Sequence, residues 1–306
     1  MKTKKGKTGY ILISCLLRPL SLLPLSFHRC CGKALGRFAF SVLRYRRDVV
    51  DINLARCFPE MKYSEIKKQS RLFYEHFGTI LGEAVWFGAG NRHGRIRKSH
   101  IVEISNPELI NALYDKGRSV IALSSHCGNW ELIGGYPHYC YGEQLRFGVN
   151  DICVTYRKMS SPAWDLFMQH NRIAALDDPE NYDGMVESFN ILRYALKHKD
   201  KQKLYNFITD QYPYSKSSCV EVSDFMGQPT KSMDGAVALA RKLGMSVVYL
   251  GMKCREDGGY TVSFSLIAED ASAMTAREML DEYYRLLEKD LREQPWNYLW
   301  THKRWK

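Results

Sequence analysis

The amino-acid sequence predicts an α/β fold, and three observations lead to this prediction. From residue 118 onward, short apolar runs alternate with segments of helical pattern, as in a sheet built from strands and connecting helices. Residues 48–86 carry apolar positions at helical spacing. The first 47 residues differ from the rest in being basic and rich in leucine. We therefore expect an α/β domain preceded by a helical segment.

The N-terminal segment is strongly basic. Residues 1–47 contain eleven lysines and arginines and no acidic residue, so the formal net charge of +11 of the whole chain can be assigned to them. Two apolar stretches, 10–17 and 20–27, lie between these cations, but an arginine and two prolines interrupt them, and they fall short of a clean membrane span. Such a segment is expected to lie on the anionic inner face of a bilayer, where each cation contributes about 1 kcal/mol.

We divide the chain into a membrane-associating segment, residues 1–47, and one globular domain, residues 48–306, because 306 residues suffice for one large domain. A cleaved secretory signal is an alternative for the first segment, but its apolar core is interrupted and no small-x-small cleavage site follows. Nucleic-acid binding is a second alternative, but the cations sit in one leucine-rich terminal segment without a nucleic-acid-binding motif. We expect no nucleic-acid partner.

The nine cysteines are scattered, odd in number and without a spacing that would build a metal site. We interpret them as reduced thiols in a cytosolic setting and expect no metal. Cys127 directly follows His126, but neighbouring residues on an extended strand point in opposite directions, so we do not expect Cys127 to act as a nucleophile.

The predicted elements follow from the two periodicities. Helices are expected at residues 48–60 and 64–86. Strands are expected at residues 119–124, 152–156, 204–209, 246–252 and 260–266. Helical segments between these strands are expected at residues 162–172, 185–198 and 234–243.

A histidine and a glutamate lie close together directly after the first apolar run, residues 120–123. They are His126 and Glu131 of the stretch His-Cys-Gly-Asn-Trp-Glu. On a continuous helix their five-residue offset would place them about 140° apart around the axis, so a turn must lie between them to bring them into contact. Gly128 permits such a turn, and Asn129 is a good N-cap for a helix that begins at the next residue.

An imidazole beside a carboxylate is suited to general base chemistry, because its pKa is ordinarily near neutrality and the carboxylate fixes its tautomer and raises its basicity. We therefore interpret His126 as a base that takes the proton from an attacking hydroxyl, and Glu131 as the residue that orients it. The alternative is a histidine near a helix N-terminus, with Glu131 complementing the helix dipole.

Two further charged residues follow predicted strands, where α/β proteins place their ligand groups. Arg157 follows residues 152–156 and can hold a phosphate, polarise a thioester carbonyl or stabilise an oxyanion, unless it is an ordinary surface arginine. Asp210 follows residues 204–209 and can orient the histidine or bind an acceptor, unless it is a plain turn residue.

Four sequence blocks, taken in order, resemble one family. They are Asn53-Leu54 followed by Phe58-Pro59-Glu60; Ser125-His126-Cys-Gly-Asn-Trp-Glu131; Thr209-Asp210-Gln211 followed by residues 222–227 and 235–244; and the terminal block Pro-Trp-Asn-Tyr-Leu-Trp-Thr-His-Lys-Arg-Trp-Lys, residues 295–306. The chain resembles the lipid A biosynthesis late acyltransferases, the lauroyl and myristoyl transferase branch of the lysophospholipid acyltransferase superfamily. The resemblance covers most of the chain, and the terminal block is its most specific part.

The resemblance implies a glycerolipid acyltransferase-like fold, with a central mixed sheet flanked by helices. It implies an O-acyltransferase of lipopolysaccharide synthesis that moves a fatty acyl chain from acyl carrier protein to a hydroxyl of a lipid A precursor, at the cytoplasmic face of the inner membrane. His126 would deprotonate this hydroxyl, which attacks the thioester directly. Arg157 and Asp210 match family positions, and we group Asn129 with them as substrate-binding residues. No cofactor is implied. A basic surface suits an acidic carrier protein and a phosphate-bearing glycolipid as partners.

One departure from the family leaves the acceptor open. The Cys-Gly-Asn-Trp between His126 and Glu131 resembles the branch that acylates other glycolipids, including phosphoinositol mannosides, so another glycolipid or phospholipid acceptor is an alternative. A lipid or thioester hydrolase would use the same base with water, although the chain lacks a Gly-x-Ser-x-Gly nucleophile motif. A non-catalytic membrane-binding protein would explain the basic segment but not the His-Glu pair.

Overall fold

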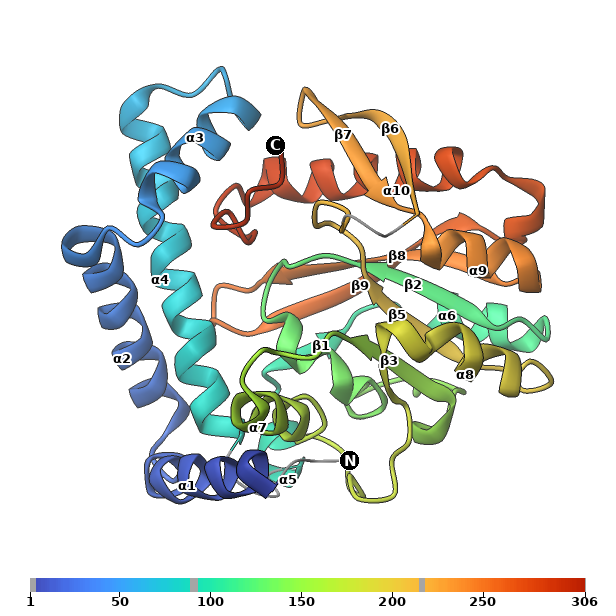
Figure 1. Cartoon of the computed structure of the whole chain (residues 1–306), viewed down its shortest axis with the longest axis horizontal. Helices are drawn as coiled ribbons and strands as arrows, with labels where there is room; N and C mark the ends of the chain where they lie inside the picture. The colour runs from blue at the N-terminus through green and yellow to red at the C-terminus, as the bar shows by residue number, and fades with distance from the viewer. Residues whose placement is uncertain (1–3, 89–92, 215–217, 306) are drawn as a thin grey trace.

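The computed structural model describes residues 4–88, 93–214 and 218–305. Its centre is a seven-stranded sheet with the strand order β1-β9-β8-β2-β5-β3-β4 (Figure 1). Strands β8, β2, β5, β3 and β4 are parallel, whereas β9 is antiparallel to β8, and β1 is parallel to β9. The predicted mixed sheet is confirmed. The strands are β1 (Val102–Ile104), β2 (Val120–Ser124), β3 (Ile152–Tyr156), β4 (Met185–Glu187), β5 (Leu204–Ile208), β8 (Ser246–Cys254) and β9 (Tyr260–Ala268).

Helices cover both faces of this sheet, and a two-stranded hairpin, β6 (Cys219–Phe225) and β7 (Gln228–Met233), packs near α10 (Figure 1). The α-helices are α1 (Lys4–Leu20), α2 (Leu25–Phe38), α3 (Arg47–Cys57), α4 (Tyr63–Gly88), α5 (His93–Lys98), α6 (Pro107–Asp115), α7 (Pro162–Arg172), α8 (Ile191–Lys197), α9 (Gly235–Leu243) and α10 (Ala276–Glu293). The shorter helices are a π-helix at Ala39–Leu43 and 3₁₀ helices at Trp130–His138, Val149–Asp151, Ser188–Asn190 and Ala271–Ala273.

The core lies in two layers because side chains alternate along each strand. On β2, Ile121 and Leu123 pack in the same cluster as side chains of α9 and α10, whereas Val120 and Ala122 pack with α6 and the 3₁₀ helix at 130–138. All four side chains are completely buried. A strand buried on both faces reads as a continuous apolar run, which is why β2 could be predicted from sequence.

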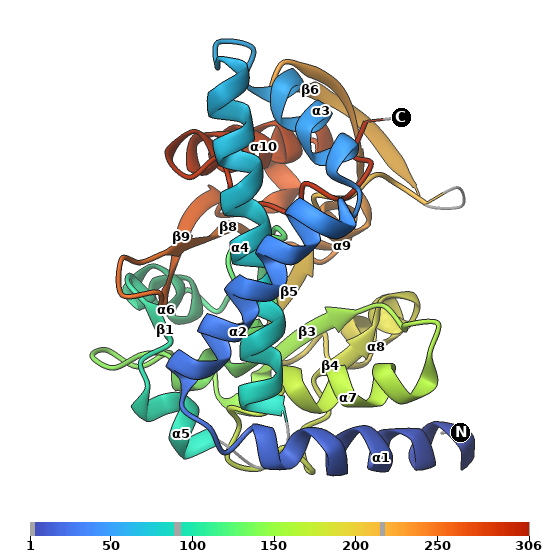
Figure 2. The same ribbon diagram turned by 90° about the vertical axis from the view of Figure 1, so that its left-hand side faces the viewer.

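Helix α2 is packed closely against α4, and Figure 2 shows α2 crossing in front of α4. Four glycines form the contact, Gly32 and Gly36 on α2 with Gly78 and Gly82 on α4. A Cβ atom at any of them would collide with a backbone carbonyl of the facing helix. The predicted boundary at residue 47 stays a prediction, but α2 is in intimate contact with the rest of the protein.

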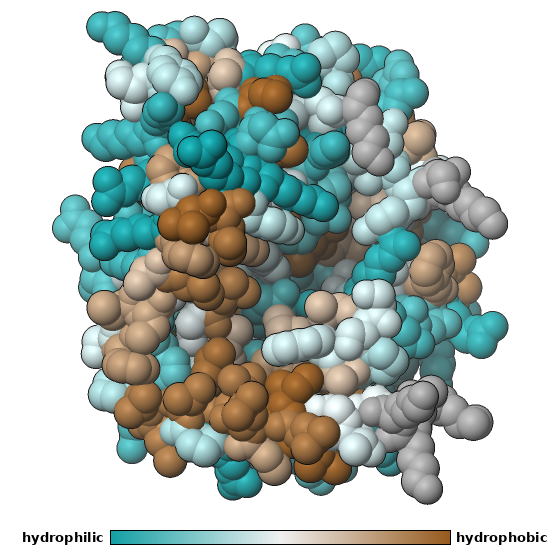
Figure 3. Space-filling model, turned by 60° about the vertical axis from the view of Figure 1, so that its left-hand side comes forward, coloured by the Kyte–Doolittle hydropathy of each residue, from teal (hydrophilic) through white to brown (hydrophobic). Residues whose placement is uncertain are grey.

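The N-terminal helices and the turn between them also carry many of the exposed large apolar side chains. Figure 3 shows them as a band over the face that carries α1 and α2. They include Ile11, Leu12, Leu16, Leu20, Leu22, Phe27, Leu35, Phe38, Val42 and Leu43. Among the described residues, no single helix is both long and apolar enough to cross a membrane; Gly6–Leu20 and Leu25–Leu43 meet the test only together, across a bend of 112°.

All five predicted strands are present, with ends within two residues of those expected. Helix α7 has the predicted bounds, and α3, α4 and α9 lie where helices were expected. Two local predictions are wrong. A helix was expected at residues 185–198, but residues 185–187 form strand β4. A helix was also expected after Asn129, but that segment is a 3₁₀ helix, because its two glycines and its proline disfavour an α-helix.

Candidate active site

Two neighbouring strands bring His126 and Asp210 together. Strands β2 and β5 pair in parallel with Ser124 opposite Ile208, and the ladder continues as the Thr209 N–H donates to the Ser124 carbonyl at 3.0 Å. The residues two positions beyond each strand therefore lie side by side at the carboxyl edge of the sheet, where α/β proteins hold their ligands. Strand β3, on the other side of β5, brings Arg157 to the same edge.

The Asp210 carboxylate receives two N–H groups of His126. Nδ1 of His126 lies 2.8 Å from Oδ1 of Asp210, and the backbone N–H of His126 donates to Oδ2 at 3.2 Å. Burial alone would raise the pKa of Asp210, but the charge and hydrogen bonds of His126 outweigh it and lower that pKa. An ionised Asp210 keeps the ring proton on Nδ1, so the lone pair of the neutral imidazole is on Nε2. This is the arrangement of an oriented general base.

The expected contact between Glu131 and His126 is replaced by a different one. Oε2 of Glu131 accepts a hydrogen bond from Nε of Arg172 at 2.6 Å, and Oε1 accepts from Nη2 of Arg172 and from the Trp130 indole, both at 3.1 Å. Glu131 lies beyond the turn, where an arginine at the end of α7 holds its carboxylate. We therefore correct the prediction: the carboxylate next to the imidazole is that of Asp210. A catalytic role of Glu131 stays a prediction.

Asn129 also differs from expectation. It precedes the 3₁₀ helix, but its side chain does not cap that helix. Its Nδ2 instead donates to Oε2 of Glu83 on α4 at 2.8 Å, and the residue is completely buried. The side chain therefore lies behind the turn, and its predicted contact with substrate stays untested.

A cavity of about 760 Å³ opens next to His126, which is a usual size for a small-molecule site. It contains three of the five predicted site residues, His126, Glu131 and Arg157, whereas Asp210 and Asn129 are not among its lining residues in the described part of the chain. Its further lining residues are Trp130, Ile133, Gly134, Val154, Thr155, Tyr156, Arg172, Ser188, Phe189, Ile191, Leu192, Asn206, Phe207, Ile208, Thr209, Gln211, Tyr214, Ser218, Met233, Gly235, Ala236, Ala238, Leu239 and Lys242. The wall is mainly apolar, with a few cations.

Arg157 is placed to bind an anion. Its guanidinium lies 3.6 Å from the ring centroid of Tyr214 and 6.0 Å from that of Phe189. Within the described part of the chain, no carboxylate forms an ion pair with it. A cation over an aromatic ring that lacks a carboxylate partner is suited to a phosphate or a developing oxyanion.

Two residues of this site were not predicted. Nε2 of Gln211 lies 3.3 Å from Nε2 of His126, so its amide contacts the ring nitrogen that carries the lone pair. Gln211 stands next to Asp210 in one of the four blocks, and that position was the available signal. Arg172 follows Glu131 by 41 residues, and no local pattern in the sequence connects the two.

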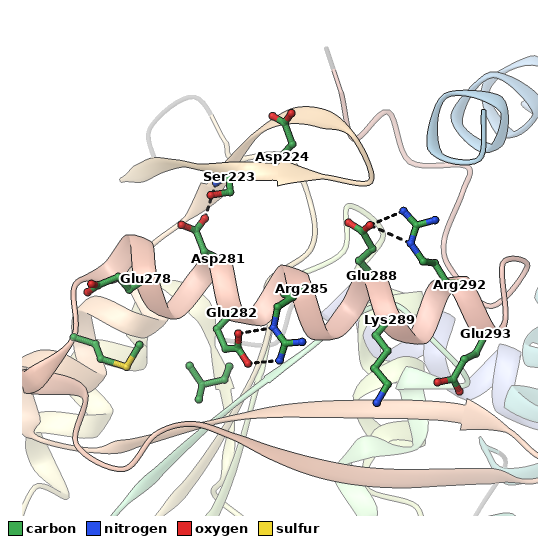
Figure 4. A pocket seen from close by; sticks show the side chains of 12 residues that line it. Ser223, Asp224, Glu278, Asp281, Glu282, Arg285, Glu288, Lys289, Arg292 and Glu293 are labelled. Atoms are coloured by element: carbon green, nitrogen blue, oxygen red, sulfur yellow. Dashed lines mark hydrogen bonds and ion pairs between the residues drawn. The ribbon is translucent and has the colours of Figure 1, made fainter. Parts of the chain in front are cut away.

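A larger hollow, of about 970 Å³, runs along α10 and faces the β6–β7 hairpin (Figure 4). Four of its charged side chains pair with one another, Arg285 with Glu282 and Arg292 with Glu288. None of the predicted site residues is among its lining residues. The candidate active site is therefore the smaller cavity at His126.

The cysteines and possible metal ligands complete the description of this region. All nine cysteines are free thiols, and burial raises the pKa of Cys127 well above its usual value, which opposes a nucleophilic role. Among the described residues, no group of three or more histidine, cysteine, aspartate or glutamate side chains is arranged to hold a metal ion. That the reaction needs neither metal nor cofactor stays a prediction.

Comparisons with known proteins address the whole chain. A family model described as bacterial lipid A biosynthesis acyltransferase matches residues 2–306. Among curated proteins, the lipid A biosynthesis lauroyltransferase of Escherichia coli (strain K12) is 24% identical over 294 residues, which covers 92% of this chain and 86% of that relative. The family match includes every residue of the candidate site.

Proposed function

Because this chain belongs to the bacterial lipid A biosynthesis acyltransferase family, and is thus an acyl-transferring enzyme, we propose that it moves a fatty acyl chain from acyl carrier protein to a hydroxyl of a lipid A precursor. The observation that carries this proposal is the His126–Asp210 pair at the wall of a mainly apolar cavity. The pair supplies a base for a hydroxyl, and the cavity offers an apolar wall to an acyl chain.

In the proposed reaction, Nε2 of His126 takes the proton from the acceptor hydroxyl as the oxygen attacks the carbonyl carbon of the thioester. The C–S bond then breaks, and the thiolate of the carrier takes the proton from the imidazolium, which restores the enzyme. Asp210 keeps the other ring proton on Nδ1 and stabilises the imidazolium charge. General base catalysis of this kind contributes about 10²- to 10⁴-fold to the rate.

The cations of the cavity have separate proposed tasks. Arg157, which has no carboxylate partner among the described residues, binds a phosphate group of the lipid acceptor or the oxyanion that forms on the thioester carbonyl. Arg172 is held in the wall by the bidentate contact with Glu131. In this proposal Glu131 positions an arginine and does not orient the base.

The net charge of the chain supports an acidic acyl donor. The formal excess of +11 favours association with an acidic carrier protein, because complementary charge raises the rate of encounter. Lys242 and Arg157 line the cavity, so cations outside residues 1–47 also lie where the acyl group would enter.

We place the enzyme at the cytoplasmic face of the inner membrane. The exposed apolar side chains of α1, α2 and the π-helix form the surface that would lie in the lipid. Arg18, Lys33 and Arg44 belong to the same segment and would contact anionic headgroups. A membrane surface also delivers the lipid acceptor to the cavity.

The test is acyl transfer from labelled acyl carrier protein to an underacylated lipid A precursor in detergent micelles. His126→Asn should reduce transfer by about 10²-fold or more, in keeping with the loss of a general base. His100→Asn is the matched control, because His100 also contacts a carboxylate, Glu103 at 3.0 Å, but on the surface and outside the cavity. It should leave transfer unchanged.

The outcomes separate the alternatives. Thioester hydrolysis that depends on His126, with no transfer to any lipid, would overturn the acyl transfer to lipid A and favour a hydrolase. Transfer to a different glycolipid would keep the mechanism and change the acceptor. Equal transfer by the protein and its His126→Asn variant would refute the proposed base.

A further inference from the structure

The turn behind His126 is held by buried polar groups from other parts of the chain. Its Gly128 has φ of +58°, a left-handed conformation that favours glycine. The N–H of Gly128 donates to Oδ1 of Asn297 at 2.7 Å, and its carbonyl lies 3.3 Å from Nε2 of His76. The next residue, Asn129, donates to a buried carboxylate on α4. The N–H and the carbonyl of Gly128 and the Asn129 amide therefore each pair with a side chain of another element.

The buried carboxylate is that of Glu83, whose side chain is completely enclosed. Its Oε2 accepts hydrogen bonds from Nδ2 of Asn129 and from the Tyr260 hydroxyl, both at 2.8 Å, and its Oε1 accepts from Nε of Arg29 at 2.7 Å. Burial raises the pKa of Glu83, while Arg29 and the two other donors act in the opposite direction. Three donors facing two oxygens match an ionised carboxylate, and this charge needs Arg29 to remain stable inside the protein.

Arg29 belongs to α2, in the basic N-terminal segment, but its guanidinium points into the protein. Besides Glu83, it donates to the carbonyl of Asp257 at 3.3 Å and to that of Gly258 at 2.7 Å, in the loop between β8 and β9. The glycines between α2 and α4 let the two backbones approach closely. This close approach places Arg29 opposite Glu83. The ion pair therefore connects α2, α4 and the turn that carries His126.

We propose that Glu83 is a positioning residue for the reaction, that it fixes the turn behind His126 through Asn129, and that Arg29 is the counter-charge it requires. The basic N-terminal segment then has a second task besides contact with lipid, because one of its cations holds the catalytic turn in place. The kinetic test of this inference rests on the proposed function, because it measures acyl transfer. Neither Glu83 nor Arg29 lines the cavity, so both act only through the turn.

The kinetic test compares Arg29→Gln, Glu83→Gln and the double variant in detergent micelles, where contact with a bilayer is not required. Each single change leaves one buried charge or donor without its partner, and the displaced turn should lower kcat by roughly ten- to a hundredfold. The KM values should stay within about threefold, since no substrate contact is removed. The double variant should recover part of the loss, because two neutral amides can pair where the ions did.

A matched control lies on the same two helices. Arg37 of α2 and Glu75 of α4 form an ion pair at 2.9 Å, but it is exposed and does not contact the turn. Arg37→Gln and Glu75→Gln should leave kcat unchanged. If they lower kcat as much as the buried pair does, the effect comes from helix packing in general and the inference is overturned.

A second measurement does not depend on activity. Hydrogen exchange of peptides that cover residues 124–132 should become faster in Arg29→Gln and Glu83→Gln, and should not change in Arg37→Gln. Arg29→Lys keeps the cation, so this variant should retain slow exchange and most of kcat. It tests the role of the charge even if Glu83→Gln folds poorly. A lysine variant as impaired as the glutamine variant would contradict the role of the charge.

The two proposals fail in different ways. If the unchanged protein shows no acyl transfer, the proposed function is wrong, and the exchange of residues 124–132 still decides whether the ion pair holds the turn. If the unchanged protein transfers acyl groups but neither kcat nor exchange responds to Arg29→Gln and Glu83→Gln, the positioning role alone is wrong. If Arg29→Gln loses vesicle binding but keeps its kcat in micelles, Arg29 is a membrane contact instead.

Discussion

Replacing Asp210 with asparagine tests the geometry of the site most directly. The carboxylate accepts both the ring N–H and the backbone N–H of His126. An amide has one oxygen and one NH₂ group, so it can accept only one of these bonds and presents a donor to the other. If the NH₂ group faces Nδ1, the ring proton moves to Nε2, and the lone pair that faces the acceptor hydroxyl is lost.

The expected loss can be worked out from these contacts. A hydrogen bond to a charged group contributes about 1.5–3 kcal/mol, so the missing stabilisation of the imidazolium alone lowers kcat by roughly 10- to 150-fold. The change of tautomer adds to this, as in a Ser-His-Asp triad, where the same substitution costs about 10⁴-fold. We therefore expect Asp210→Asn to lower kcat by about 10²- to 10⁴-fold, with KM within about threefold, since Asp210 does not line the cavity.

The assay is steady-state acyl transfer in micelles, with thermal unfolding measured on the same samples. Asp290→Asn is the control, because Asp290 accepts a hydrogen bond from Tyr249 at 2.8 Å and pairs with Lys253 at 3.0 Å, away from the cavity. It should lower stability and leave kcat of the folded protein unchanged. A folded Asp210→Asn variant with kcat within about fivefold of the unchanged protein would refute the view that Asp210 orients the base.

Three further predictions follow from other contacts of the structure. Glu131→Gln removes the charge that holds Arg172, so KM should rise more than kcat falls in steady-state kinetics. An equal loss of kcat and kcat/KM would contradict this and indicate that Glu131 acts in the chemical step. Gly78→Ala sets a methyl group against the backbone of α2, which should cost about 1–3 kcal/mol and lower Tm, whereas Gly94→Ala, with open space around it, should not. Burial lowers the pKa of His76 from 6.5 to about 4, so the unfolded chain binds the extra proton between these values, and the free energy of unfolding should fall as the pH falls from about 6.5 to 4, by at most about 3 kcal/mol. The difference in urea denaturation between the protein and its His76→Gln variant isolates this contribution, and a difference that does not vary with pH would contradict it.

Much of the sheet could be predicted because its strands are buried on both faces. Strands β2, β3 and β8 contain continuous apolar runs, and β5 is apolar except for Asn206; such patterns are visible without knowledge of the fold. Strand β4 was assigned to a helix because its three residues continue directly into a helical pattern, and only pairing with β3 makes them a strand. The local sequence contains no sign of that pairing.

The sequence allowed most residues of the candidate site to be predicted, but not which of them contact one another. His126 and Asp210 both follow apolar runs, and that position marked them as ligand groups. Which of them meet depends on strand order, since β2 and β5 are neighbours in space but 84 residues separate the two side chains. Glu131 was assigned to His126 because it is near in sequence, and the assignment failed because Arg172, from a distant helix, binds its carboxylate more directly than any local residue.

The terminal block, residues 295–306, also helps to hold His126 and Asp210 in place. His126 and Asp210 stand on separate loops, so a distance of 2.8 Å between them requires both loops to be held by one body. Asn297 binds the N–H of Gly128 in the first loop, and the hydroxyl of Tyr298 donates to the carbonyl of Asp210 in the second, at 3.3 Å. None of the described residues of the block lines the cavity, yet two adjacent ones contact both halves of the pair. The block therefore holds the two loops in register through two adjacent side chains, Asn297 and Tyr298.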